Sequence, residues 1–240
     1  MTFPNPTTEI VAADEPRSEI RLFDVIAVFF VSMVTASIGY AVGGSIGGAG
    51  SYAETCAGLI GLWAGLIPGT VVICRIRGTG NLITDLGLRF KFPSDLIGVA
   101  VGIACQFVML PLIYVVVQLF VSRDLTKDLE APAKDLTNNA HGAGFYFLAV
   151  LLVIGAPVVE EIYYRGMLLR SLKRHMPAWP AIVVTGLVFG AAHFDLVTLP
   201  GLAAFGMVLA YLSHRSGRLG PNILAHAAFN LVTVIALWHG

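Results

Sequence analysis

Charged residues are scarce in this chain of 240 residues. Lys, Arg, Asp and Glu make up 12% of it, whereas 56% of the residues are hydrophobic and the mean hydropathy is +0.79. A soluble globular domain carries roughly 25% charged residues. The composition therefore excludes an ordinary soluble domain and predicts a membrane protein. The 15 basic residues are balanced by 15 acidic ones, so net charge gives no support for a nucleic-acid partner, and we expect none.

Other features are missing as well. The three cysteines, Cys56, Cys74 and Cys105, lie in apolar runs without CxxC spacing, so we expect buried thiols and no disulfide framework. Neither the strand–turn–helix context of a serine-hydrolase elbow nor an HExxH zinc motif is found, which disfavours both chemistries. Residues 1–21 lack the short basic segment of a secretory signal. We expect them to form an uncleaved, mobile cytoplasmic tail.

Long uncharged runs are what the sequence does contain. Seven of them are separated by short polar breaks: Val25–Val42, Thr55–Cys74, Leu96–Val121, Phe145–Met167, Pro180–His193, Leu199–Ser213 and Asn222–Trp238. The first four reach the roughly 17–25 residues that a helix needs to cross a bilayer, whereas the fifth and sixth are short. We therefore predict an all-α, polytopic bundle of seven or eight transmembrane helices. Residues 22–240 are expected to form a single membrane domain.

The basic residues predict how the chain crosses the membrane. Lys and Arg are enriched in loops that stay in the cytoplasm. With a cytoplasmic N-terminus, twelve of the 15 basic residues fall inside: Arg17, Arg21, Arg75, Arg77, Arg89, Lys91, Arg165, Arg170, Lys173, Arg174, Arg215 and Arg218. Only Arg123, Lys127 and Lys134 fall in an outer loop. We expect a multi-pass protein of the cell membrane with its N-terminus in the cytoplasm.

Glycines recur at a spacing of four residues in three of the runs. The positions are Gly39/Gly43, Gly61/Gly65/Gly69 and Gly98/Gly102. Small residues at this spacing let helices approach closely in membranes. We interpret them as contacts within one polypeptide rather than as a dimer interface. The stretch Gly43–Gly48 is predicted to be a flexible outer turn.

Two adjacent acids, Glu160 and Glu161, interrupt an uncharged run that begins at Leu136. One charge at the bilayer centre costs about 2.5–3.5 kcal/mol on insertion scales, so we expect polar partners for the pair. On a helix, Glu161 and Arg165 are four residues apart and share a face. This pairing would leave Glu160 free to address water. Pro157 is expected to bend or break the helix just before the acids.

The partners are polar residues in later apolar runs. His193 ends one run, and His226 lies one helical turn before Asn230 in the last run. A glutamate shielded from bulk water can take a proton from water, an imidazole can orient that water, and a second imidazole with an amide can donate to an oxyanion. These parts suit amide hydrolysis. The alternatives are an acid pair that only neutralises nearby arginines, and polar residues that only join helices by hydrogen bonds.

The order of these residues resembles a known family. Glu160-Glu161 with Arg165, Phe189 with His193, and His226 with Asn230 are similar to the EExxxR, FxxxH and HxxxN motifs of the intramembrane proteases that include type II CAAX prenyl endopeptidases and bacteriocin-processing proteins. The resemblance covers about residues 145–235. It implies that Glu160 and His193 activate water. It also implies that His226 and Asn230 stabilise the oxyanion, with Glu161 and Arg165 as a supporting ion pair.

Cofactor and substrate stay open at this point. Glu160, His193 and His226 could supply three ligands to a zinc ion, or they could act without metal, which we favour. The expected substrate is a membrane-associated or lipidated peptide or protein. A non-catalytic immunity or scaffold protein of the same fold and a proton-coupled transporter are the rival functions. The sequence does not indicate an oligomeric state.

Overall fold

The computed structural model describes residues 19–122, 125, 129 and 142–239. All regular structure in these residues is helical, which confirms the predicted all-α class. Four of the described helical rods are long and apolar enough to cross a membrane: Leu22–Gly47, Tyr52–Arg77, Ser94–Gln118 and Ala143–Leu172. The chain is a multi-pass helical membrane protein. The predicted tail and the outer loop with Arg123, Lys127 and Lys134 fall almost wholly outside the described residues.

The described residues contain seven long rods and one short helix. The first two rods are α1 (Leu22–Gly47) and α2 (Tyr52–Arg77), followed by the short α3 (Leu82–Leu86). The third rod joins α4 (Ile97–Ala104) to α5 (Leu110–Gln118) through a π-helical segment, Cys105–Met109. The fourth contains α7 (Ala143–Val150), α8 (Ala156–Glu161) and α9 (Leu169–Leu172). The last three are α10 (Ala178–Ala191), α11 (Leu199–Ser216) and α12 (Gly220–His239).

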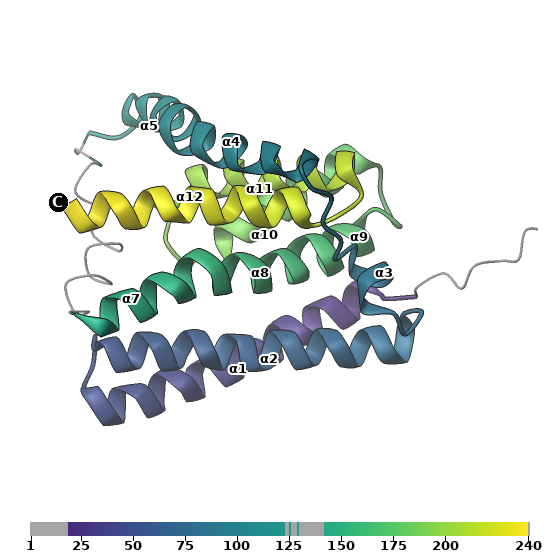
Figure 1. The fold of residues 1–240 in the computed structure, drawn as a ribbon, viewed down its shortest axis with the longest axis horizontal. Coiled ribbons are helices and arrows are strands. Elements are labelled where there is room, and N and C mark those ends of the chain that lie inside the picture. The colour runs from purple at the N-terminus through teal and green to yellow at the C-terminus, as the bar shows by residue number, and fades with distance from the viewer. Residues whose placement is uncertain (1–18, 123–124, 126–128, 130–141, 240) are drawn as a thin grey trace, which may run out of the picture.

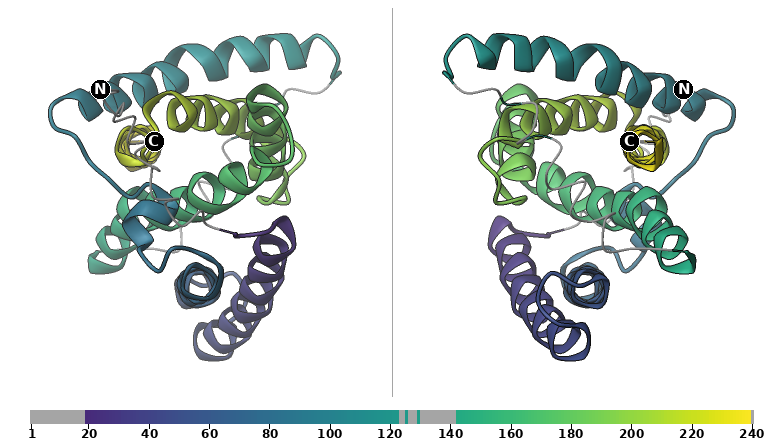
Figure 2. Two further views of the ribbon diagram at one scale, coloured as in Figure 1. Left: turned by 90° about the vertical axis from the view of Figure 1, so that its right-hand side faces the viewer. Right: turned by 90° about the vertical axis from the view of Figure 1, so that its left-hand side faces the viewer.

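The rods form a helical body with a hairpin at its side. In Figure 1, α12 lies between the α4–α5 rod and the α7–α9 rod, and α10 and α11 lie behind it. The end-on views of Figure 2 show the α1–α2 hairpin beyond the α7–α9 rod, on the side away from α4 and α5. The α7–α9 rod therefore contacts both α12 and the hairpin.

Glycines set the closest helix contacts. A methyl group at Gly39 or Gly61 would collide with backbone of the opposite helix in the α1–α2 pair, and one at Gly98 or Gly102 would collide with the backbone of α12. These spacings therefore serve packing within the chain, as predicted. The prediction of an outer turn over Gly43–Gly48 is wrong in part, because α1 continues through Gly47. The Gly48 N–H still donates to the Gly44 carbonyl, and φ first becomes positive at Gly48.

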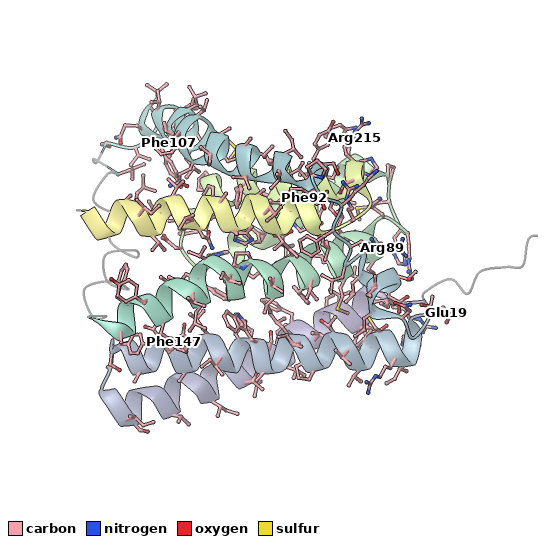
Figure 3. All side chains as sticks on the ribbon, in the orientation of Figure 1. Glu19, Arg89, Phe92, Phe107, Phe147 and Arg215 are labelled. Carbon is pink, nitrogen blue, oxygen red and sulfur yellow. The ribbon has the colours of Figure 1, made fainter. Side chains whose placement is uncertain are left out.

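The outer faces of the rods are apolar, and charges gather at one end. Phe30 on α1 is 64% exposed and Leu112 on α5 is 63% exposed, which suits contact with lipid tails. Figure 3 shows Glu19, Arg89 and Arg215 at the end of the molecule that carries α3. At this end Arg218 forms an ion pair with Asp95. The charged end and the apolar flanks agree with a bundle that lies across a bilayer.

Candidate active site

The rod that carries Glu160 and Glu161 is not a uniform α-helix. α8 lies between two π-helical segments, Leu151–Gly155 and Ile162–Leu168. Such segments are rare and occur often at functional sites, because each adds a residue to a turn and redirects the side chains around it. The break expected at Pro157 is not seen. The rod continues through the proline because the turn before it has π-helical geometry.

Asn230 completes the hydrogen bonding of this rod. The N–H of Ala156 donates to the carbonyl of Leu151, five residues earlier. In the same register Pro157 would face the Leu152 carbonyl, but proline has no N–H. The Asn230 side-chain amide, from α12, donates to that carbonyl at 2.8 Å. One of its two amide hydrogens is thereby used, and the second remains for another acceptor.

Glu161 and Arg165 form a fully buried ion pair. Arg165 Nη1 donates to Glu161 Oε1 at 2.7 Å, and neither side chain is exposed. Arg165 Nη2 also donates to the carbonyl of Gly206 on α11 at 2.9 Å, and the guanidinium lies 4.7 Å from the centre of the Phe189 ring. The arginine thus joins three rods. These contacts offset part of the cost of burying the charges, although Glu161 Oε2 and Arg165 Nε have no hydrogen-bond partner among the described residues.

His226 lies between the two acids. Its Nδ1 donates to Glu161 Oε1 at 3.0 Å, since a carboxylate oxygen accepts. This bond fixes the ring so that Nε2 faces Glu160, with 3.9 Å between Nε2 and Oε2. That distance is too long for a direct hydrogen bond. Glu161 therefore orients the histidine as well as pairing with the arginine, a double role that the sequence motif does not reveal.

His193 is held by its own helix end. Its Nδ1 donates to the Phe189 carbonyl at 2.8 Å, which leaves Nε2 as the unprotonated nitrogen of the neutral ring. The next residue, Phe194, has φ of 54°, a value uncommon for a residue other than glycine. On the same loop, the Val197 carbonyl accepts from the Tyr114 hydroxyl of α5 at 3.0 Å. The loop after His193 is thus tied to a neighbouring rod.

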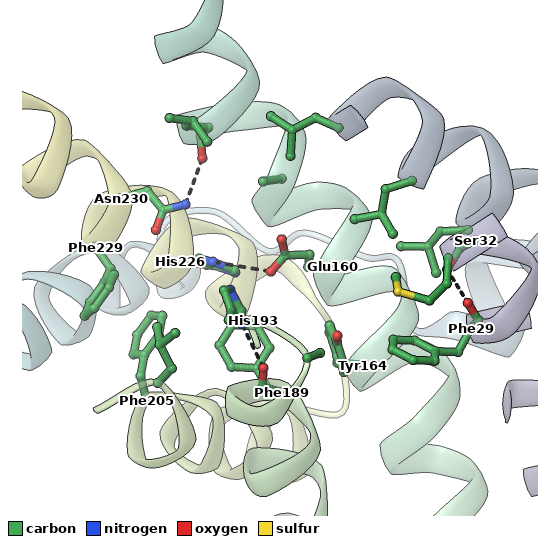
Figure 4. Close-up of a pocket in the computed structure, with 18 residues that line it drawn as sticks. Phe29, Ser32, Glu160, Tyr164, Phe189, His193, Phe205, His226, Phe229 and Asn230 are labelled. Atoms are coloured by element: carbon green, nitrogen blue, oxygen red, sulfur yellow. Dashed lines mark hydrogen bonds and ion pairs between the residues drawn. The ribbon is translucent and has the colours of Figure 1, made fainter. Parts of the chain in front are cut away.

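These side chains meet in one cavity of about 250 Å³. Glu160, His193, His226 and Asn230 all line it, as Figure 4 shows. Glu160 Oε2 has no hydrogen-bond partner among the described residues, and its side chain is 16% exposed. A buried carboxylate oxygen without a protein partner leaves a place for water or substrate. The polar residues of three separate rods therefore converge, as the sequence led us to expect. Their chemical roles stay predictions.

Several residues that line the cavity were not identified from the sequence. Tyr164 lines the cavity beside Phe189, is 6% exposed, and its hydroxyl has no recorded hydrogen bond to a described residue. The cavity also reaches residues of α1 and α2 that no motif singled out. The adjacent tyrosines Tyr163 and Tyr164, which precede Arg165 in the sequence, were the signal that could have pointed to Tyr164. Nothing in the apolar runs of the hairpin marked its lining residues.

A metal site was considered for Glu160, His193 and His226. Among the described residues, no group of three or more His, Cys, Asp and Glu side chains lies close enough together to hold a metal ion. The Nδ1 atom of each imidazole donates to an acceptor and leaves the Nε2 lone pair free, as in many metal-ligating histidines. As placed, the three residues do not form a metal site, and the expectation that no metal is needed stays a prediction.

Comparison with known proteins finds a family match over the stretch that contains Glu160, His193, His226 and Asn230. The family model described as Type II CAAX prenyl endopeptidase Rce1-like matches residues 142–232. We call residues 142–232 the Rce1-like segment, because this stretch is similar to that family. The resemblance read from the three motifs is confirmed over it. The Rce1-like segment runs from the start of α7 into α12 and leaves α1 to α5 outside the match.

A curated relative matches a similar length of chain. The protein of Bacillus subtilis (strain 168) described as "Putative membrane peptidase YdiL" is 30% identical over 88 residues. Those residues are 37% of this chain and 36% of that protein, so the match spans about a third of the relative. No solved structure matches the chain.

Proposed function

We propose that this protein is an intramembrane endopeptidase that hydrolyses a peptide bond with water activated by Glu160. The observation that carries the proposal is the unpartnered Glu160 carboxylate oxygen in a cavity shared with two oriented imidazoles. The Rce1-like match over residues 142–232 supports the same reaction class. The expected substrate is a membrane-tethered or lipidated peptide or protein, because the cavity lies among rods that cross the bilayer.

The reaction needs only groups of the chain. Glu160 accepts a proton from a water molecule, and His193 Nε2 accepts the second hydrogen bond of that water and orients it. The water oxygen attacks the carbonyl carbon of the peptide. The oxyanion accepts hydrogen bonds from the second amide hydrogen of Asn230 and from protonated His226 Nε2. Glu160 then returns its proton to the leaving amine as the C–N bond breaks.

The Glu161–Arg165 ion pair supports this step by holding the His226 ring in place. Glu161 accepts from His226 Nδ1, so it holds the ring in the orientation that turns Nε2 toward Glu160. A buried carboxylate plays the same orienting role behind the histidine of serine proteases. Arg165 balances the charge of Glu161 and so lowers the cost of burying it.

The proposal is tested with purified protein and a library of membrane peptides. Glu160→Gln keeps the shape of the side chain and removes the base, and we expect cleavage to fall at least about a hundredfold. His193→Ala should also lose cleavage. Glu54→Gln is the matched control, because Glu54 lies in the first turn of α2 and outside the cavity.

Equal cleavage by the parent and by Glu160→Gln would overturn the proposal. Binding of a peptide without cleavage in any variant would favour a scaffold or immunity protein. Proton-coupled uptake into vesicles that Glu160→Gln abolishes would favour a transporter. Folding of each variant is checked by its elution as a single species and by its melting temperature.

We propose further that no metal ion is obligatory. Protein treated with a chelator, shown by elemental analysis to hold no ion, should cleave at the rate of untreated protein. Activity lost on chelation and restored by Zn²⁺ would overturn this part.

The proposed orientation has a cytoplasmic N-terminus in the cell membrane. The three native cysteines are buried, so a single introduced cysteine dominates labelling. Arg215 and Ser45 are exposed and lie at the end of α11 and near the end of α1. In whole cells an impermeant thiol reagent should label Ser45→Cys and should reach Arg215→Cys only after the cells are opened. The reverse pattern would invert the orientation.

A further inference from the structure

The cavity has two chemically different sides. One side carries Glu160, the two imidazoles and Asn230, together with apolar residues of the body such as Phe205 and Phe229. The other side is supplied by α1 and α2, through Phe29, Ser32, Met33, Leu59, Leu62 and Leu66. Five of these six residues are apolar, and none is charged. Ser32 donates its hydroxyl hydrogen to the Phe29 carbonyl at 2.7 Å, so it offers no donor to the cavity. We call these six residues the α1–α2 wall.

The α1–α2 wall is held at a fixed position relative to Glu160. The Tyr163 hydroxyl, on the same rod as Glu160, donates to the Val25 carbonyl of α1 at 3.0 Å. The Tyr163 ring also stacks on Phe29, with 6.2 Å between ring centres. Within the hairpin, a side chain at Gly65 would collide with the backbone of Ser32. The wall is therefore preformed rather than assembled by a ligand.

The chemistry of the wall selects its occupant. A polar or charged side chain placed against it would lose its water and find only the Ser32 hydroxyl oxygen as an acceptor. An apolar side chain would gain from burial of its surface. The cavity, at about 250 Å³, is smaller than the roughly 300–1,000 Å³ of pockets for drug-sized ligands. It has room for a short stretch of extended peptide and not for a folded element.

We propose that the α1–α2 wall is a specificity subsite, which binds an apolar side chain of the substrate next to the bond attacked by water. The inference rests on the proposed function. The wall and the polar residues line one continuous cavity, so a peptide at Glu160 places a neighbouring side chain within reach of the wall. Figure 4 shows Phe29 and Ser32 on the side of Tyr164 away from Asn230. The wall lies wholly outside the Rce1-like segment, so selection and chemistry are divided between two parts of the chain.

The first test measures cleavage of a peptide series. Synthetic quenched peptides differ at one position beside the cleaved bond, which is Ala, Leu, Phe or Asp. The parent should favour Leu and Phe over Asp by about tenfold or more in kcat/KM. Met33→Trp fills the cavity, so the ratio of kcat/KM for Phe over Ala should fall about tenfold, whereas Met33→Ala should raise it. Val34→Trp is the control, because Val34 is 61% exposed and does not line the cavity.

Equal ratios in Met33→Trp and Val34→Trp, or a parent that cleaves all four peptides alike, would overturn the subsite. Leu59→Phe is a second filling variant if Met33→Trp fails to fold. These outcomes differ from failure of the proposed function, which shows as cleavage that survives Glu160→Gln.

The second test measures binding and does not depend on cleavage. Glu160→Gln protein is titrated with fluorescent forms of the same four peptides. The Leu and Phe peptides should bind at least about tenfold more tightly than the Asp peptide, and added Met33→Trp should abolish that difference. Binding that is equal for all four peptides would overturn the subsite even in a protein that cleaves none of them.

Discussion

The α1–α2 hairpin and the body formed by α7 to α12 are both packed in the same apolar surroundings, yet different contacts hold them. In the body, Arg165, Glu161 and His226 form a buried chain of charged hydrogen bonds across three rods. In the hairpin, glycines bring two apolar helices into backbone contact, and the ion pair Arg77–Asp24 lies near the helix ends. A buried polar chain accepts few substitutions, whereas an apolar contact accepts many. The family match falls on the body alone.

The largest expected effect comes from the buried arginine. Arg165→Met leaves Glu161 charged in the core with only the hydrogen bond from His226, which should lower the free energy of unfolding by about 3–5 kcal/mol. The double variant Glu161→Gln with Arg165→Met should recover part of that loss. Denaturant unfolding in detergent measures both.

The matched variant in the hairpin is Arg77→Met, which should cost about 0–1 kcal/mol because the Arg77 side chain is 35% exposed. Equal losses of unfolding free energy in Arg165→Met and Arg77→Met would contradict the contrast between the body and the hairpin.

Glycine substitutions should give a smaller effect with a different outcome in each region. Gly102→Ala and Gly39→Ala each force neighbouring backbone apart, and each should cost about 1–3 kcal/mol. Gly102 abuts Ala225, the residue before His226, so Gly102→Ala should shift His226 and lower turnover up to about a hundredfold. Gly39→Ala moves the hairpin and should alter the choice among peptides more than turnover. Steady-state kinetics on the peptide series measure turnover and peptide preference in both variants. The same changes in Gly102→Ala and Gly39→Ala would contradict the division of chemistry and selection between the body and the hairpin.

The smallest expected effect concerns two adjacent tyrosines. Tyr163→Phe removes the hydrogen bond to the Val25 carbonyl and should cost about 0.5–1.5 kcal/mol. Tyr164→Phe removes a hydroxyl with no recorded partner among the described residues and should change stability by less than about 0.5 kcal/mol. Melting of both variants in parallel tests the pair. A larger loss at Tyr164 would show that its hydroxyl has a structural role.

The sequence predicted the rods and the meeting of polar residues well, because both follow from local pattern and from the cost of charge in lipid. The run Phe145–Met167 predicted the rod Ala143–Leu172, and the presence of Glu160 and Glu161 in it required partners on other rods. The prediction that failed was the break at Pro157, because it assumed α-helical hydrogen bonding around the proline. The Leu152 carbonyl in the π-helical turn accepts from Asn230, far along the chain, and no local pattern contains that contact.

The α1–α2 wall could not be predicted for a related reason. Met33 and Leu62 look like any other apolar residues of a transmembrane run, and only the packing of the hairpin decides which of them meet lipid and which line the cavity. The role of Glu161 in orienting His226 was hidden because the motif already explained Glu161 through Arg165. Nothing in the sequence therefore indicated that Glu161 also accepts a hydrogen bond from His226.

The bond from Asn230 to the Leu152 carbonyl also bears on the order in which the protein is assembled. The two residues are 78 positions apart, so the fourth rod is synthesised well before the helix that supplies its missing donor. An unsatisfied carbonyl in lipid costs several kcal/mol. Because Asn230 and His226 lie on the same helix, docking of α12 supplies this donor and brings His226 to the acids together.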